Sequence, residues 1–125
     1  MKKLLSLLIV LSCTFNVLAQ EEEILDATDL DTLKERAETE VIVEGFVTEI
    51  GKTKNDSITF INIGLPKKQG FVALIRQKDY SAFPDGFGIY DAKKVRVKGF
   101  LKLYKNEIPQ ISMTSPEQIE IIEIE

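Results

Sequence analysis

Ten consecutive residues in the second half of the chain, Val95 to Tyr104, alternate strictly between two kinds of side chain. Successive side chains of a β-strand point to opposite faces, so this pattern predicts a strand with one face in a core and the other in water. The face expected in the core carries Val95, Val97, Gly99, Leu101 and Leu103. The face expected in water is basic and aromatic, and carries Arg96, Lys98, Phe100, Lys102 and Tyr104.

Four further segments show the alternation or the short apolar run of a strand, and polar turns separate them. One or two helical turns are predicted over residues 77–83, because Pro84 ends them. A short helix is predicted from Asp26 to Ala37, with Thr28 or Asp29 as its N-cap. The four strands are expected at residues 41–50, 57–64, 70–76 and 108–113, and residues 119–122 are expected to extend the sheet.

The predicted order is three strands, a short helix and two strands, which is the connectivity of the OB-fold. We therefore expect a mainly β protein: a five-stranded Greek-key barrel with a short N-terminal helix and a short helix between strands three and four. Gly45 and Gly99 stand in mid-strand, where a strand that coils around a small barrel bends. The expected organisation is a signal peptide (1–19), an acidic lead-in and short helix (20–40), of which residues 20–25 have no periodicity, and the barrel (41–125).

The first nineteen residues have the pattern of a secretory signal peptide. Lys2 and Lys3 precede an apolar run, and Ala19 ends the segment with the kind of residue that a signal peptidase reads. This predicts an exported protein, periplasmic or secreted, with no transmembrane segment in the mature chain. Alternatively, residues 10–13 resemble a lipobox, in which case Cys13 would carry a lipid anchor.

Charge is distributed unevenly along a chain whose formal net charge is −4. Residues 20–40 carry nine acids against two bases, whereas residues 41–116 carry twelve bases against seven acids. Binding depends on the local field rather than on the total, so a polyanionic ligand remains compatible with the acidic composition. The same asymmetry suggests that the acidic segment 21–40 lies over the basic barrel and competes with such a ligand.

Several segments resemble exported bacterial OB-fold domains of the nucleic-acid-binding type. The resemblance covers residues 41–122 and depends mostly on residues that determine the fold. It departs from the related pattern at Ala92-Lys93 and at Asn106-Glu107, where glycine-containing turns are common. The segments that carry the resemblance are 41–47, 59–64, 70–75, 95–99, 109–111 and 115–119.

Catalysis is not expected, and no cofactor or metal is expected. The chain has no histidine, and no cysteine remains after cleavage at Ala19, which excludes histidine-dependent triads, cysteine nucleophiles and zinc sites built from those ligands. Nucleases of the staphylococcal type share the OB barrel, but they need metal-binding carboxylates and paired arginines. This chain has only Arg36, Arg76 and Arg96, and its scattered aspartates are typical of turns and caps.

OB-folds usually bind ligands on strands two and three and on the flanking loops. Phe60 and Phe71 are candidates for stacking on bases, although either could instead fill the core. The outer stripe of the fourth strand is the second candidate surface, although cationic strand faces also occur without any ligand. The full set of candidate nucleic-acid-binding residues is Phe60, Asn62, Phe71, Arg76, Lys67, Lys68, Arg96, Lys98, Phe100, Lys102 and Tyr104, with Lys52 and Lys54 at the rim.

Two functions fit these features. The first is weak binding of single-stranded nucleic acid with little sequence preference, through the aromatic residues and the basic rim. The alternative is an envelope interaction module that uses the same barrel to bind a protein, peptide or glycan, since one fold serves all these ligands.

Overall fold

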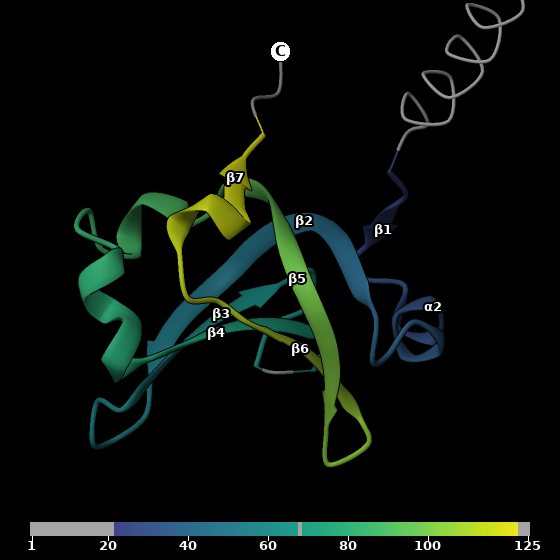
Figure 1. The fold of residues 1–125 in the computed structure, drawn as a ribbon, viewed down its shortest axis with the longest axis horizontal. Helices are drawn as coiled ribbons and strands as arrows, with labels where there is room; N and C mark the ends of the chain where they lie inside the picture. The colour runs from purple at the N-terminus through teal and green to yellow at the C-terminus, as the bar shows by residue number, and fades with distance from the viewer. Residues whose placement is uncertain (1–21, 68, 123–125) are drawn as a thin grey trace, which may run out of the picture.

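The computed structural model describes residues 22–67 and 69–122, and these residues form a mainly β, barrel-like fold (Figure 1). The seven strands form one mixed sheet, and short helices lie between them. The helical segments are α2 (Leu30–Glu35) and the 3-10 segments η1 (Gln77–Ala82), η2 (Gly88–Tyr90) and η3 (Pro116–Gln118). The strands are β1 (Ile24–Asp26), β2 (Glu40–Lys52), β3 (Ile58–Ile63), β4 (Phe71–Arg76), β5 (Lys94–Tyr104), β6 (Ile108–Ser112) and β7 (Ile119–Ile121).

Five of the strands pair in a circuit that returns to its starting strand. β2 pairs antiparallel with β3, β3 antiparallel with β4, and β4 parallel with β6. β6 then pairs antiparallel with β5, and β5 antiparallel with β2. The two short strands extend this arrangement: β1 lies parallel to β2, and β7 lies antiparallel to β5.

The strand predicted from Val95 to Tyr104 is confirmed as β5, with the faces in the expected orientation. Val95, Val97, Gly99 and Leu101 are buried, whereas the basic and aromatic residues between them are half-buried or exposed. The core also includes inward side chains of β2, β3, β4 and β6, such as Val43, Ile61 and Ile111 in the sheet interior. The alternating pattern therefore placed this strand correctly, because its two faces meet such different surroundings.

The N-terminal part of the described chain is more ordered than its sequence predicts. Ile24–Asp26 form strand β1, where the sequence shows no periodicity, and Leu25 is buried in the core. The helix predicted over Asp26–Ala37 is wrong in length, because it spans only Leu30–Glu35. Asp29 caps it as expected, since its side chain accepts a hydrogen bond from the Thr32 amide.

The shorter helix has a local cause at each end. The Thr28 backbone N–H donates to the Asp26 carboxylate, which forms a turn before the helix begins. After the helix, Glu38 has a positive φ of 66°, and its N–H donates to the Leu101 carbonyl of β5. Hydrogen bonds to a distant strand thus replace the last helical turn that the local sequence predicts.

The predicted signal peptide, the lipobox at Cys13 and the side chain of Lys68 lie outside the described residues. Within the part that is described, no helix combines the length and the apolar character that a membrane crossing requires.

Candidate functional site

The outward residues of β3, β4 and β6 line up in rows, because neighbouring residues on these strands are in register. Phe60 lies opposite Leu74, and Leu74 lies opposite Ser112. The adjacent row runs from Asn62 through Val72 to Gln110 and on to Lys102 of β5. Asn62, Val72 and Leu74 in the middle of these rows are only 3%, 0% and 4% exposed. The accessible parts of the face are therefore the half-buried ring of Phe60 at one side and the exposed end of β5 at the other.

Phe71 is wrong as a stacking candidate. Its side chain is fully buried, with 0% exposure, because it pairs with Ile63, whose side chain also points into the core. Phe60 lies on the opposite face of the same sheet, in register with Leu74. Only one of the two aromatic residues can therefore contact a ligand without unfolding the protein.

Arg76 lies on the same outer face as Phe60, at the end of β4. Its Nη1 donates a 2.9 Å hydrogen bond to Oγ of Ser112 on β6, and the side chain is exposed. This contact directs the guanidinium toward β6, on the side of β4 away from Phe60. A planar cation and an aromatic ring on one face suit a phosphate chain with stackable bases.

Asn62 also points outward, but neighbouring side chains cover it and leave 3% exposed. Its Nδ2 donates a 3.4 Å hydrogen bond to Oε1 of Glu49. The same oxygen accepts a 2.7 Å hydrogen bond from the backbone N–H of Lys67, a residue with a positive φ of 56°. Glu49 therefore organises this edge of the face by binding both β3 and the loop that follows it.

β5 crosses from one side of the fold to the other, and this divides its basic and aromatic stripe. Arg96, Lys98 and Phe100 lie opposite residues of β2, whereas Lys102 and Tyr104 lie opposite residues of β6. Lys102 and Tyr104 consequently join the surface that carries Phe60 and Arg76. The other three residues lie over β1, β2, β5 and β7 and form a second surface. The two surfaces meet at Phe100, because Nζ of Lys102 lies 5.9 Å from the centre of its ring.

Acidic side chains from β2 neutralise part of this second surface. The Glu44 carboxylate binds Nε of Arg96 at 2.7 Å and Nζ of Lys94 at 3.1 Å. The hydrogen bond from Arg96 is the largest cause that holds the pKa of Glu44 below its usual range, and the hydrogen bond from Lys94 is the next largest. The local sequence of β5 gave no sign of this pairing, because Glu44 is fifty-two positions away from Arg96.

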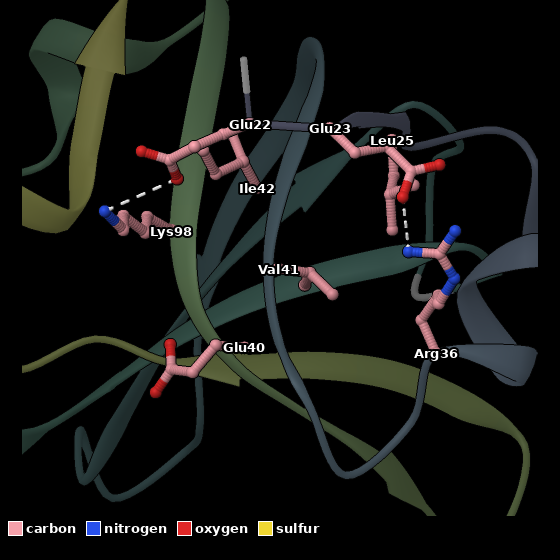
Figure 2. A pocket seen from close by; sticks show the side chains of 8 residues that line it. All are labelled: Glu22, Glu23, Leu25, Arg36, Glu40, Val41, Ile42 and Lys98. Carbon is pink, nitrogen blue, oxygen red and sulfur yellow. Dashed lines mark ion pairs between the residues drawn. The ribbon is translucent and has the colours of Figure 1, made fainter. Parts of the chain in front are cut away.

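A depression of about 280 Å³ lies on this second side, and in it Oε2 of Glu22 lies 3.7 Å from Nζ of Lys98. Figure 2 shows the side chains that line the depression, with this ion pair as a dashed line. A second ion pair joins Glu23 to Arg36 at 2.5 Å. Glu22 of the acidic segment thus lies against a basic residue of β5, whereas Glu23 pairs within the segment. Competition of this segment with a polyanion stays a prediction. Both ion pairs are solvent-exposed, so each contributes little to stability. The depression is lined by Glu22, Glu23, Leu25, Arg36, Glu40, Val41, Ile42 and Lys98.

Stability is expected to fall in acid partly through Glu44. Its pKa is lowered on folding, so the contribution is complete above the unfolded-state pKa and is lost as pH falls through the folded-state value. Glu44→Gln should therefore reduce the free energy of unfolding at pH 7 by about 1 kcal/mol and flatten its decline toward pH 3. Urea denaturation across this pH range measures both effects. An unchanged pH profile would contradict the role of this carboxylate.

The remaining candidate cations lie at the rim. Lys54 and Lys67 are exposed in the β2–β3 and β3–β4 loops, and Lys52 pairs with Asp56 at 3.3 Å. Among residues 22–67 and 69–122, no group of three potential ligands is arranged to hold a metal ion.

Comparison with known proteins gives information on the fold. No protein-family model matches the sequence, and no curated protein matches it significantly. Solved structures do match. A chain assigned as an aspartyl-tRNA synthetase from Leishmania major Friedlin is 10% identical with a TM-score of 0.56, covering 82% of this chain and 21% of that one. The aspartyl-tRNA synthetase of Entamoeba histolytica is 15% identical with a TM-score of 0.54. This match covers 81% of this chain and 22% of that one.

A third similar structure is the OBody AM1L10 bound to hen egg-white lysozyme, which is 13% identical with a TM-score of 0.53 and covers 85% of this chain and 96% of that one. The chain shares its fold with these proteins. It spans only about a fifth of each synthetase chain. At these identities the similarity concerns the backbone, and the side chains described above are this protein's own.

Proposed function

We propose that this protein is an OB-type barrel that binds single-stranded nucleic acid through the outer face of β3, β4 and β6. The observation that carries the proposal is that Phe60, Arg76, Lys102 and Tyr104 share the outward face of neighbouring strands and are each at least partly exposed. The closed circuit of five strand pairings and the similarity to two tRNA synthetase chains support it.

The chemistry of this surface suits a flexible polyanion. A base stacked on an aromatic ring contributes on the order of 1–3 kcal/mol with little dependence on its identity, and cations bind the phosphates. Phe60 and Tyr104 supply the rings, and Arg76 and Lys102 supply the cations. Binding through these groups would be salt-dependent and would have little sequence preference. The proposal includes export of the protein and a role in binding rather than in catalysis.

Fluorescence anisotropy with labelled single-stranded DNA and RNA tests the proposal. Affinity should fall steeply between about 50 and 200 mM salt, and Phe60→Ala should weaken binding roughly 5- to 150-fold. Lys98 and Lys102 provide a matched pair, because they are the same residue type on the same strand but lie on different surfaces. Lys102→Gln should reduce the salt slope by about 0.7, whereas Lys98→Gln should leave it unchanged.

Equal effects of the two lysine changes would show that both surfaces bind, and would contradict the location proposed here. Absence of binding at low salt would reject the nucleic-acid function.

A second candidate function is binding of a protein or peptide. The observation that favours it is the OBody structure, in which a protein similar in fold is bound to lysozyme. Affinity that is insensitive to salt would distinguish this function, because polyanion binding releases counterions.

A further inference from the structure

The side of the molecule opposite Phe60 carries half of the exposed large apolar side chains. Six are exposed among the described residues, and Ile24, Phe46 and Phe100 lie on the outward face of β1, β2 and β5, whereas Ile121 of β7 is in register with the inward Val95. Single exposed apolar residues are common, but several gathered over one sheet indicate an interaction surface. Three depressions are found on the same side, with volumes of about 280, 400 and 590 Å³.

The largest depression is a groove between the segment around β1 and the segment around β7. Ile24, which is 42% exposed, and Ile42 give it an apolar part. The opposite wall is η3 and β7, where the Gln118 side chain donates to the Lys98 carbonyl at 3.0 Å and accepts from the Thr114 amide at 2.7 Å. These bonds hold the wall in place. The groove is lined by Glu22, Ile24, Ile42, Arg96, Lys98, Glu117, Gln118 and Glu120.

The cations of this groove are already paired, whereas two of its carboxylates are not. Arg96 binds Glu44, and Lys98 binds Glu22. Among the described residues, neither Glu117 nor Glu120 forms an ion pair, and both are exposed. The groove therefore presents two unpaired negative charges beside an apolar floor, which disfavours a polyanion and favours a cationic group with an apolar body.

Such a group projects from the opposite end of the same molecule. The hairpin between β5 and β6 lies at the lower edge of Figure 1, whereas β7 and η3 lie at the upper edge. The hairpin carries Lys102, Lys105 and Tyr104, whose side chain is 49% exposed, and one acid, Glu107. Lys105 lies 5.3 Å above the Tyr104 ring, so cation and ring form one unit.

The hairpin has a defined turn geometry in the single chain. Its turn residues have positive φ angles, and the Glu107 N–H donates to the Tyr104 carbonyl at 3.0 Å. A preorganised element loses little conformational entropy when it docks.

We infer that the hairpin of one copy docks in the groove of a second copy of this chain. Lys102 and Lys105 would meet Glu117 and Glu120, and Tyr104 would cover Ile24. Because the two contact surfaces differ, the association is head-to-tail and does not close at a dimer. Packing of two grooves against each other is disfavoured, since it would bring the same unpaired carboxylates together. If the proposed function holds, nucleic acid and a second copy compete for Lys102 and Tyr104.

Sedimentation equilibrium without nucleic acid tests the inference independently of the proposed function. At low salt the mean mass should rise above that of the monomer as concentration increases, and at about 0.5 M salt it should return to the monomer value. Two charge-reversal variants, Glu117→Lys/Glu120→Lys and Lys102→Glu/Lys105→Glu, should each be monomeric. An equimolar mixture of the two should associate again, which a merely misfolded variant could not do.

A protein that stays monomeric at all concentrations in low salt would overturn the inference. So would charge-reversal variants that each self-associate as the original protein does. A closed dimer that the hairpin change does not affect would also overturn it. The last would indicate a symmetric contact between copies. Circular dichroism of each variant confirms that it is folded.

Discussion

Replacement of Phe71 by alanine should lower the free energy of unfolding by about 3–5 kcal/mol. The side chain is fully buried among the inward residues of the sheet, so the change removes apolar contacts and leaves a cavity. Such a loss is a large part of the 5–15 kcal/mol that stabilises a typical domain. Urea denaturation followed by circular dichroism measures it.

Phe60→Ala is the matched control, because it makes the same chemical change on the neighbouring strand. Phe60 is half-buried on the outer face, so we expect a loss of about 1 kcal/mol. The two variants should therefore separate clearly: one loses stability and the other loses binding. Equal losses of stability would contradict the assignment of the two rings to opposite faces.

The second large effect is expected at Gly45 in β2. A Cβ atom at this position would lie 2.7 Å from Cβ of Ala27 and 2.9 Å from Cγ2 of Ile63. Ala27 cannot move away easily, because it is buried and its N–H donates to the Glu44 carbonyl at 2.8 Å. Gly45→Ala should therefore cost about 1–3 kcal/mol through overpacking.

Gly51 lies on the same strand and provides the control, since no atom lies within 4 Å of a Cβ built there. Gly51→Ala should leave stability unchanged or raise it by up to about 1 kcal/mol, because alanine loses less backbone entropy than glycine. Thermal melts of both variants give the comparison. A Gly45 variant as stable as the Gly51 variant would mean that the N-terminal segment is not packed as described.

The strands could be predicted from the sequence because each has a face in the core and a face in water. Val95 to Leu101 illustrate this, since alternation fixed both the strand and its orientation. The bend expected at the mid-strand glycines stays a prediction, because the register irregularity of β2 lies between Val47 and Glu49 and pairing is regular through Gly45 and Gly99. Gly45 allows the close approach of Ala27, a contact that no local pattern encodes.

The candidate site was less predictable, for two physical reasons. β3 and β4 are covered over much of both faces, so periodicity could not show whether Phe60 or Phe71 points into the core. The strand register decides this, because Phe71 pairs with the inward Ile63 and Phe60 pairs with Leu74 on the outer face. Charges on β5 were visible, but their partners were not. Arg96 is paired by Glu44 and Lys98 by Glu22, and both acids lie far away in the sequence.

The central claim is that nucleic acid binds on the face of β3, β4 and β6. Amide chemical-shift mapping by NMR, during titration with an oligothymidine on the order of ten nucleotides long, tests it most directly. We predict that the shifts concentrate at Phe60, Leu74, Arg76, Ser112 and Tyr104. Shifts confined to β1, β2 and β7, or none at low salt, would contradict the account.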